Sequence, residues 1–176
     1  MATKWLIDPT HSEIQFKVKH LMITTVTGDF KTYTLEVETE TDDFSTTKQV
    51  SFSTDIASID TKNEQRDGHL KSPEFFDVEN HPKITFTSSS YKSDGDEGSI
   101  TGNLTIKGIT HPVTFKSEFG GIVVDPYGQT KAGFTINGKI SRKEFGLTWS
   151  AVTEAGNVVL SDEIKLVAEV QLVKQA

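Results

Sequence analysis

Hydrophobic and polar residues alternate with a period of two over most of this chain, which is the pattern of strands that bury one face. Ile14, Phe16 and Val18, for example, alternate with charged and polar neighbours. The same alternation predicts eight strands, at residues 14–18, 33–37, 50–54, 84–88, 100–106, 113–117, 132–140 and 164–172. We therefore predict an all-β protein.

The links between these segments favour antiparallel pairing of strands that are neighbours in sequence. Asp94-Gly95-Asp96-Glu97-Gly98 and Lys107-Gly108 contain the glycines that tight hairpin turns require. Because no link has the length of a Greek-key crossover, we favour an up-and-down barrel over a sandwich. The prediction is an extended eight-stranded antiparallel β-barrel, forming a single domain over residues 1–176.

Short helices are predicted only in the loops at the barrel ends. Thr61-x-x-Glu64 and Ser141-x-x-Glu144 match the capping box, and Ser72-Pro73 places proline at a first helical position. The longest loop, from Ile59 to Phe86, is rich in ionisable and aromatic residues. Long loops in compact domains are commonly functional, so this loop is the first place to look for a site.

Composition excludes several classes of function. The 18 basic and 25 acidic residues give a net charge of -7, which disfavours nucleic acid as a partner. Without cysteine, disulfides and thiol catalysis are excluded. The chain has no run of 18 apolar residues, so we expect no integral membrane segment. The start Met1-Ala2-Thr3-Lys4-Trp5 has no signal-peptide pattern, so we expect a cytoplasmic protein, or a periplasmic one if a signal was removed.

The sequence offers no positive sign of a metal, a cofactor or catalysis. The five histidines lack the close spacings of zinc sites, and no nucleophile motif is present; the histidines are His11, His20, His69, His81 and His111. We therefore expect no metal site, no cofactor and no catalytic residue.

An eight-stranded barrel is wide enough either to be filled by side chains or to hold one small ligand. Large inward positions alternate with the small residues Gly102, Gly138, Ala132 and Ala168. Complementary packing of large against small is one interpretation, and a dry apolar cavity for a long hydrocarbon is the other. The candidate cavity wall is Phe16, Val18, Leu35, Phe52, Phe86, Leu104, Phe115, Phe134, Ile136 and Trp149.

A second group of residues is expected at one mouth of the barrel. His20 continues the inward parity of its strand, although a packed core histidine is the more ordinary interpretation. Arg66 and His69 share the helix face of Leu70, where Arg66 either meets a ligand or pins its own loop. The candidate residues for contacting a ligand head group are His20, Arg66, His69, Phe75, Phe76 and Arg142, with the two phenylalanines as plug or gate.

Several motifs occur in a characteristic order along nearly the whole chain. They include Asp8-Pro9-x-His11-Ser12, Gly28-x-Phe30, Arg66-Asp67-x-His69-Leu70-x-Ser72, Phe75-Phe76, Pro82-x-Ile84-x-Phe86 and Arg142-x-x-Phe145-Gly146. With these motifs the chain resembles the YceI-like family, bacterial polyisoprenoid-binding proteins with lipocalin-like barrels. The resemblance implies an isoprenoid tail in an elongated pore, a polar head near the mouth, no catalytic residues to carry over, and frequently a homodimer.

Three hypotheses of function follow. The first is non-enzymatic binding, carriage or sequestration of a long-chain amphiphilic lipid, foremost a polyisoprenoid such as a prenyl phosphate or an isoprenoid quinone. The second is an enzyme that acts on a lipid head group through His20, Arg66 and His69. The third is a protein-interaction module with a solid core.

Overall fold

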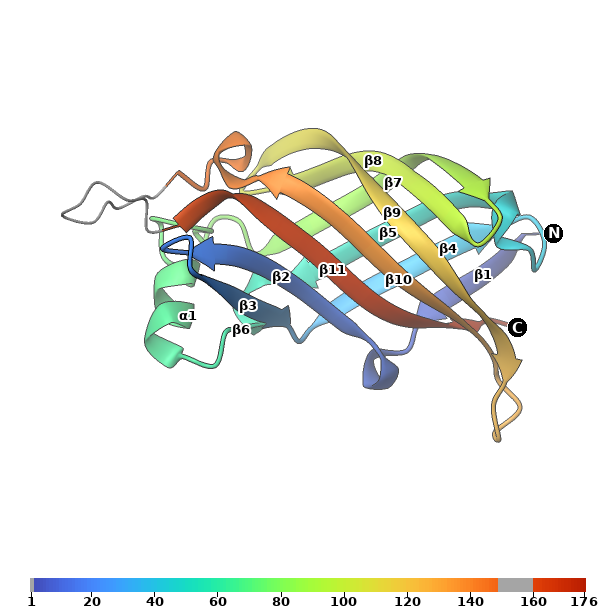
Figure 1. Ribbon diagram of the computed structural model, residues 1–176. Coiled ribbons are helices and arrows are strands. Elements are labelled where there is room, and N and C mark those ends of the chain that lie inside the picture. The colour runs from blue at the N-terminus through green and yellow to red at the C-terminus, as the bar shows by residue number, and fades with distance from the viewer. Residues whose placement is uncertain (1, 149–159) are drawn as a thin grey trace.

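The computed structural model describes residues 2–148 and 160–176, which form an elongated antiparallel β-barrel (Figure 1). Its strands are β1 (Thr3–Ile7), β2 (Glu13–His20), β3 (Thr24–Phe30), β4 (Tyr33–Thr39), β5 (Thr47–Asp55), β6 (Ile59–Asp60), β7 (Lys83–Asp94), β8 (Glu97–Ile106), β9 (Ile109–Val124), β10 (Thr130–Ser141) and β11 (Leu160–Lys174). The helical segments are α1 (Glu64–Lys71) and the 3-10 turns η1 (Pro9–His11), η2 (Phe44–Thr46), η3 (Ile56–Ser58) and η4 (Arg142–Phe145).

Eight strands close the barrel, in the order β1-β4-β5-β7-β8-β9-β10-β11, with β11 pairing back to β1. Strand β11 has two neighbours on the same side, because its last residues pair with β1 and the stretch before them pairs with β2. Strands β3 and β6 continue the sheet beyond β2. The predicted closed eight-stranded antiparallel barrel is therefore confirmed.

The list of predicted strands was incomplete, because β1, β3 and β6 were not foreseen. Strand β1 contains three apolar residues in a row, Trp5, Leu6 and Ile7, which hides the alternation. In β3 the buried face carries a glycine, Gly28, and a Cβ there would lie 2.2 Å from the Phe16 ring. A pattern of apolar side chains cannot find a strand whose buried position holds no side chain.

Both ends of the barrel are closed by aromatic side chains. At the end where the termini lie, the rings of Trp5 and Phe44 are 4.6 Å apart, and the Trp5 indole nitrogen donates to Thr39 Oγ1. At the opposite end, where Figure 1 shows α1, the buried Phe75 and Phe76 line a void together with Leu70 of α1. Aromatic rings are therefore buried at each end of the barrel.

Of the two predicted helix starts, the one at Thr61 is wrong, and the one at Ser141 has the right position without the predicted capping bond. Asn63, not Thr61, caps α1, and its side chain accepts a hydrogen bond from the Arg66 backbone at 3.0 Å. The positive φ of Lys62, 64°, turns the chain just before this cap. Ser141 makes no capping bond to η4, because its hydroxyl donates to Asp162 instead.

The segment Ser72-Pro73 begins no helix. Ser72 is the residue after the last turn of α1, and its backbone nitrogen donates to the His69 carbonyl. In the described part of the chain, no helix is long and apolar enough to cross a membrane.

Candidate functional site

Three apolar voids follow one another inside the barrel. The central void has a volume of about 120 Å³ and lies among the middle segments of the strands. A termini-side void of about 30 Å³ shares Leu35, Val50 and Ile136 with it. A helix-side void of about 60 Å³ shares Phe30, Ile84 and Ile106 with it and reaches Phe75 and Phe76. The voids therefore form a row from the Trp5 end to the α1 end.

The central void offers no free polar group among the described residues that line it. Its polar lining residues are Gln15 and Thr54, and both side chains are already bonded. Gln15 Nε2 donates to Asp29 at 2.9 Å, and Thr54 Oγ1 donates to the Thr32 carbonyl at 2.8 Å. A void without polar partners does not order water, so its walls suit a hydrocarbon.

The predicted wall residues that the structure describes all line one of the three voids. Leu35, Phe52, Phe86, Leu104, Phe115 and Ile136 line the central void, Phe134 lines the termini-side void, and Phe16 and Val18 line the helix-side void. Trp149 lies outside the described residues. The inward parity read from the sequence is therefore right for these positions, while their contact with a ligand stays a prediction.

The small inward residues do not leave a continuous bore, contrary to the sharper of the two interpretations. A Cβ on Gly138 would lie 2.4 Å from the Phe115 ring, and one on Gly102 would lie 2.8 Å from the Phe86 ring. These two rings meet edge to face with centroids 5.1 Å apart. Large therefore packs against small at the glycines, whereas Ala168 does border the central void.

Phe75 and Phe76 line the helix-side void, and their role as a plug or gate stays a prediction. Both are buried, and Leu70 of α1 lines the same void. The α1 helix has no buried residue, so this plug is covered by a helix that is itself weakly packed.

Arg66 and His69 are bonded within their own loop. The exposed Arg66 donates from Nε to Thr61 Oγ1 at 2.8 Å and from Nη2 to the Thr61 carbonyl at 2.6 Å. His69 Nε2 lies 2.5 Å from Glu74 Oε2, and its ring meets Phe75 edge to face. The geometry therefore supports the interpretation that Arg66 pins its loop.

His20 is half-buried at the end of β2, where it pairs with Thr24 and Leu160. His20 is not among the described residues that line the three voids, and its contact with a ligand head group stays a prediction. Groups of three or more potential metal-ligating side chains are absent from the described residues.

Arg142 is a structural residue in the wall of the helix-side void rather than an exposed mouth residue. It is 2% exposed, and burial lowers the pKa of its guanidinium. Its nitrogens donate to the carbonyls of Ser161 at 2.9 Å, Leu147 at 2.7 Å and Leu160 at 3.4 Å. Arg142 thus fastens η4 to the start of β11.

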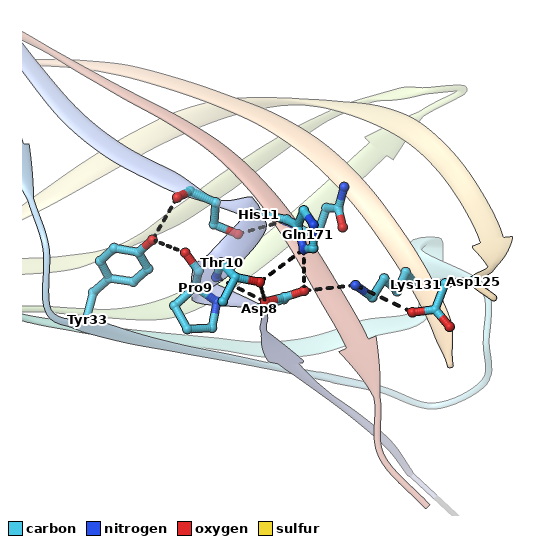
Figure 2. A network of polar contacts seen from close by, with 9 residues as sticks. Asp8, Pro9, Thr10, His11, Tyr33, Asp125, Lys131 and Gln171 are labelled. Carbon is cyan, nitrogen blue, oxygen red and sulfur yellow. Dashed lines mark hydrogen bonds and ion pairs between the residues drawn. The ribbon is translucent and has the colours of Figure 1, made fainter. Parts of the chain in front are cut away.

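A second polar cluster, not foreseen from the sequence, lies outside the row of voids (Figure 2). Asp8 accepts hydrogen bonds from Lys131 Nζ at 2.8 Å and from the hydroxyl of Thr10 at 2.7 Å, and it lies 2.8 Å from His11 Nδ1. Lys131 also lies 3.6 Å from Asp125. Asp8 and His11, which belong to the motif at the start of the chain, therefore hold η1 against β10.

The charges of this cluster stabilise one another. The hydrogen bond from Lys131, followed by those from Thr10 and His11, holds the pKa of Asp8 well below its usual value. The same bond raises the pKa of Lys131. Lys131 lies 123 residues away from Asp8, so no local pattern indicates the contact.

Comparison with known proteins gives consistent matches. The YceI-like domain model matches residues 5–172. A UPF0312 protein of Staphylococcus epidermidis is 39% identical over 171 residues, covering 96% of each chain. A crystal structure of the Campylobacter jejuni YCEI protein is 35% identical, with a TM-score of 0.77 and 90% of each chain covered.

One further solved structure supports the fold alone. It is a polyisoprenoid binding domain from Saccharophagus degradans, 13% identical, with a TM-score of 0.68 and coverage of 97% of this chain and 98% of that one.

Proposed function

Because this chain belongs to the YceI-like domain family, we propose that it binds a long-chain apolar lipid inside its barrel and carries or sequesters it unchanged. The observation that carries the proposal is the row of three apolar voids along the barrel axis. A polyisoprenoid, either a prenyl phosphate or an isoprenoid quinone, is the first candidate. The Saccharophagus neighbour, described as polyisoprenoid-binding, makes this class the one to test first.

The energetics assign affinity to the tail of such a ligand. Burying one five-carbon isoprenoid unit is worth about 3 to 4 kcal/mol, at about 0.8 kcal/mol per carbon. Association first costs about 4 to 15 kcal/mol. Three or more units must therefore be buried, whereas an exposed ion pair at the head adds about 1 kcal/mol or less.

The size of the voids sets a condition on binding. An engineered apolar cavity of about 150 Å³ in another protein admits a benzene ring. The central void, at about 120 Å³, is of that order, so it does not hold a long chain as it stands. A polyisoprenoid must join the three voids, so side chains that neighbouring voids share, such as Phe30 on the helix side and Leu35 on the termini side, must move to let it pass.

The α1 end is the end where the lipid enters. The plug there consists of Phe75 and Phe76 beneath a helix with no buried residue. At the other end Trp5 is completely buried, packed on Phe44 and bonded to Thr39. Segments with few buried contacts open at the lowest free energy, so the plug opens before the Trp5 end does.

The other two hypotheses gain no support from the geometry. The interior contains voids, which a solid core does not have. Arg66 and His69, proposed as head-group catalysts, are engaged by Thr61 and Glu74. A pH-dependent turnover that is lost in His69→Ala would revive the enzyme hypothesis.

Filling the central void tests the proposal. Ala168 borders this void, so Ala168→Phe places a ring in the path of the lipid. We expect at least a tenfold loss of affinity for a fluorescent prenyl lipid, with cooperative thermal unfolding retained. Lys165→Phe, on the exposed face of the same strand, is the control and should bind as the wild type does. Equal affinity in both variants would contradict binding inside the barrel.

A further inference from the structure

The turn between β2 and β3 holds apolar side chains in water at the α1 end of the barrel (Figure 1). Met22 and Ile23 are 61% and 77% exposed, and we call these two residues the apolar tip. Leu21 and Met22 have positive φ angles, 53° and 60°. The Ile23 nitrogen donates to the His20 carbonyl at 3.2 Å, which closes a two-residue hairpin turn.

The residues in this turn are costly for the isolated chain. A hairpin turn with two positive φ angles favours Asn-Gly, because a large side chain in the left-handed region is strained. Met22 is mostly exposed, so packing does little to offset that strain. The apolar tip therefore fits a role in which it contacts something outside this chain.

Lysines lie side by side on the outer face of the strands that lead to the tip. Lys165 of β11 is directly opposite Lys139 of β10 and also directly opposite Lys17 of β2. Side chains of directly opposed residues point to the same face, where like charges destabilise the sheet. Lys19, two residues nearer the tip than Lys17, points to this face as well. We call these four residues the lysine patch.

The positive charge of the lysine patch is only partly neutralised by the described residues. Glu163 lies 3.8 Å from Lys139, and both side chains are more than half exposed. In the described part of the chain, the other three lysines of the patch make no ion pair. The β2–β3 hairpin has no acidic residue from Ile14 to Gly28. The patch therefore keeps an excess of positive charge in a chain whose net charge is -7.

Many of the acidic residues gather at the other end of the barrel. Five of the eight residues at 36–43, which lead into the β4–β5 turn, are acidic, and so are three of the four at 94–97, in the β7–β8 turn. Both turns lie at the end of the termini in Figure 1. This separation of charge turns the lysine patch toward an anionic surface and the acidic turns away from it.

We propose that the apolar tip and the lysine patch dock this protein on the surface of a bilayer that contains anionic lipid. A stable protein partner would need about 800 Å² of surface from about 20 to 30 residues, far more than two apolar side chains offer. Interfacial binding to a membrane combines a small apolar insertion with cations for the anionic head groups.

The spacing of the tip and the patch fits this geometry. Lys19 comes three residues before Met22, about 10 Å along the chain at about 3.3 Å per residue. An inserted tip therefore leaves Lys19 within about one screening length of the head groups. The proposal does not depend on lipid binding inside the barrel. Combined with lipid entry at the α1 end, it sets the entrance of the barrel against the bilayer.

Flotation with vesicles tests the proposal without any prenyl lipid. The full chain should float with vesicles of phosphatidylcholine and phosphatidylglycerol, and it should bind at least tenfold more weakly to phosphatidylcholine alone. Raising NaCl from about 0.1 M to about 1 M shortens the screening length from about 10 Å to about 3 Å, so binding should weaken. Absence of binding to the anionic vesicles would overturn the proposal.

A charge reversal in the lysine patch separates docking from folding. Lys17→Glu replaces repulsion from Lys165 by attraction, so the Tm should stay level or rise, while affinity for the anionic vesicles should fall at least tenfold. Lys92→Glu, on the exposed face of β7, makes the same change in net charge and should bind as the wild type does. Equal losses in the two variants would overturn the proposal, because general repulsion would explain both.

A substitution in the apolar tip tests whether the anionic surface is a membrane. Ile23→Ser should weaken binding to the anionic vesicles at least fivefold, whereas Val123→Ser, at a 64% exposed position near the other end, should not. Unchanged binding in Ile23→Ser would overturn the proposal, because the lysines alone would then bind any polyanion. Lys17→Glu should still take up prenyl lipid in vesicle-free solution, so docking and lipid binding can fail separately.

Discussion

Arg142 is a cation buried in the wall of an apolar void, where it satisfies three backbone carbonyls. Arg142→Met removes the donors and leaves those carbonyls without their partners. We expect the free energy of unfolding to fall by about 3 kcal/mol or more, measured by urea denaturation. Lys143→Met changes the exposed neighbour, and its free energy of unfolding should fall by less than about 0.5 kcal/mol. Similar losses in the two variants would refute this role of Arg142.

The Asp8 carboxyl makes stability depend on pH in the acid range. Its folded pKa is depressed, first by Lys131, so its contribution is present above the unfolded pKa of about 3.9 and is lost as pH falls through the folded value. The pKa of Lys131 is raised on folding, so its contribution to stability has the opposite pH dependence. That contribution is lost only as pH rises past the ordinary lysine value.

Asp8→Asn should therefore lose stability at pH 6 and show a smaller further loss between pH 6 and pH 3 than the wild type shows. Urea midpoints at these two pH values measure the difference. Unchanged pH dependence in the variant would show that Asp8 is not a principal acid-sensitive group.

Sequence pattern predicted which way side chains point, but not what they bond to. Period-two alternation assigned Phe52, Phe86 and Phe134 to the interior correctly. Two of the three carbonyls that Arg142 binds lie 18 and 19 residues away in the sequence, and the partners of Asp8 include a residue in a distant strand. Such contacts depend on how the barrel closes, which no local pattern contains.

At the scale of the strands, β10 and β11 provide a direct test of inward and outward faces. Phe134 faces the termini-side void, and Lys165 on the neighbouring strand is exposed. Phe134→Glu puts a charge on the inner wall and should abolish uptake of a prenyl lipid, whereas Lys165→Glu should leave uptake unchanged. Quenching of tryptophan fluorescence measures lipid uptake in the two variants. Equal effects of the two substitutions would contradict the assigned inward and outward faces.

Glycines explain why β3 was not predicted and why the predicted cavity was more continuous than the observed voids. Gly28, Gly102 and Gly138 all lie against phenylalanine rings, so the buried space at these positions belongs to a side chain from another strand. A sequence shows that a position is small, but it does not show whether a neighbour fills the space. The predicted capping bonds of Thr61 and Ser141 are absent for a related reason, because Asp67 and Asp162 bind those hydroxyls, although Ser141 does stand just before η4.

At the scale of the whole molecule, the two closed ends of the barrel differ in how firmly they are held. Phe76→Ala loosens the plug beside α1, and Phe44→Ala makes the same truncation at the Trp5 end; both side chains are buried. We expect at least fivefold faster exchange of bound lipid in Phe76→Ala and little change in Phe44→Ala. Stopped-flow transfer to vesicles measures the rates. Faster exchange in Phe44→Ala than in Phe76→Ala would place the opening at the other end.

The central claim is that the row of voids is the binding site of a long apolar lipid. Organic extraction of the purified protein, followed by mass spectrometry, measures this most directly, with native mass spectrometry giving the stoichiometry. The account predicts about one long-chain lipid per barrel, or stoichiometric uptake of added prenyl lipid by lipid-free protein, and loss of either in Ala168→Phe. Repeated absence of lipid from the extract, together with no uptake of added prenyl lipid, would contradict it.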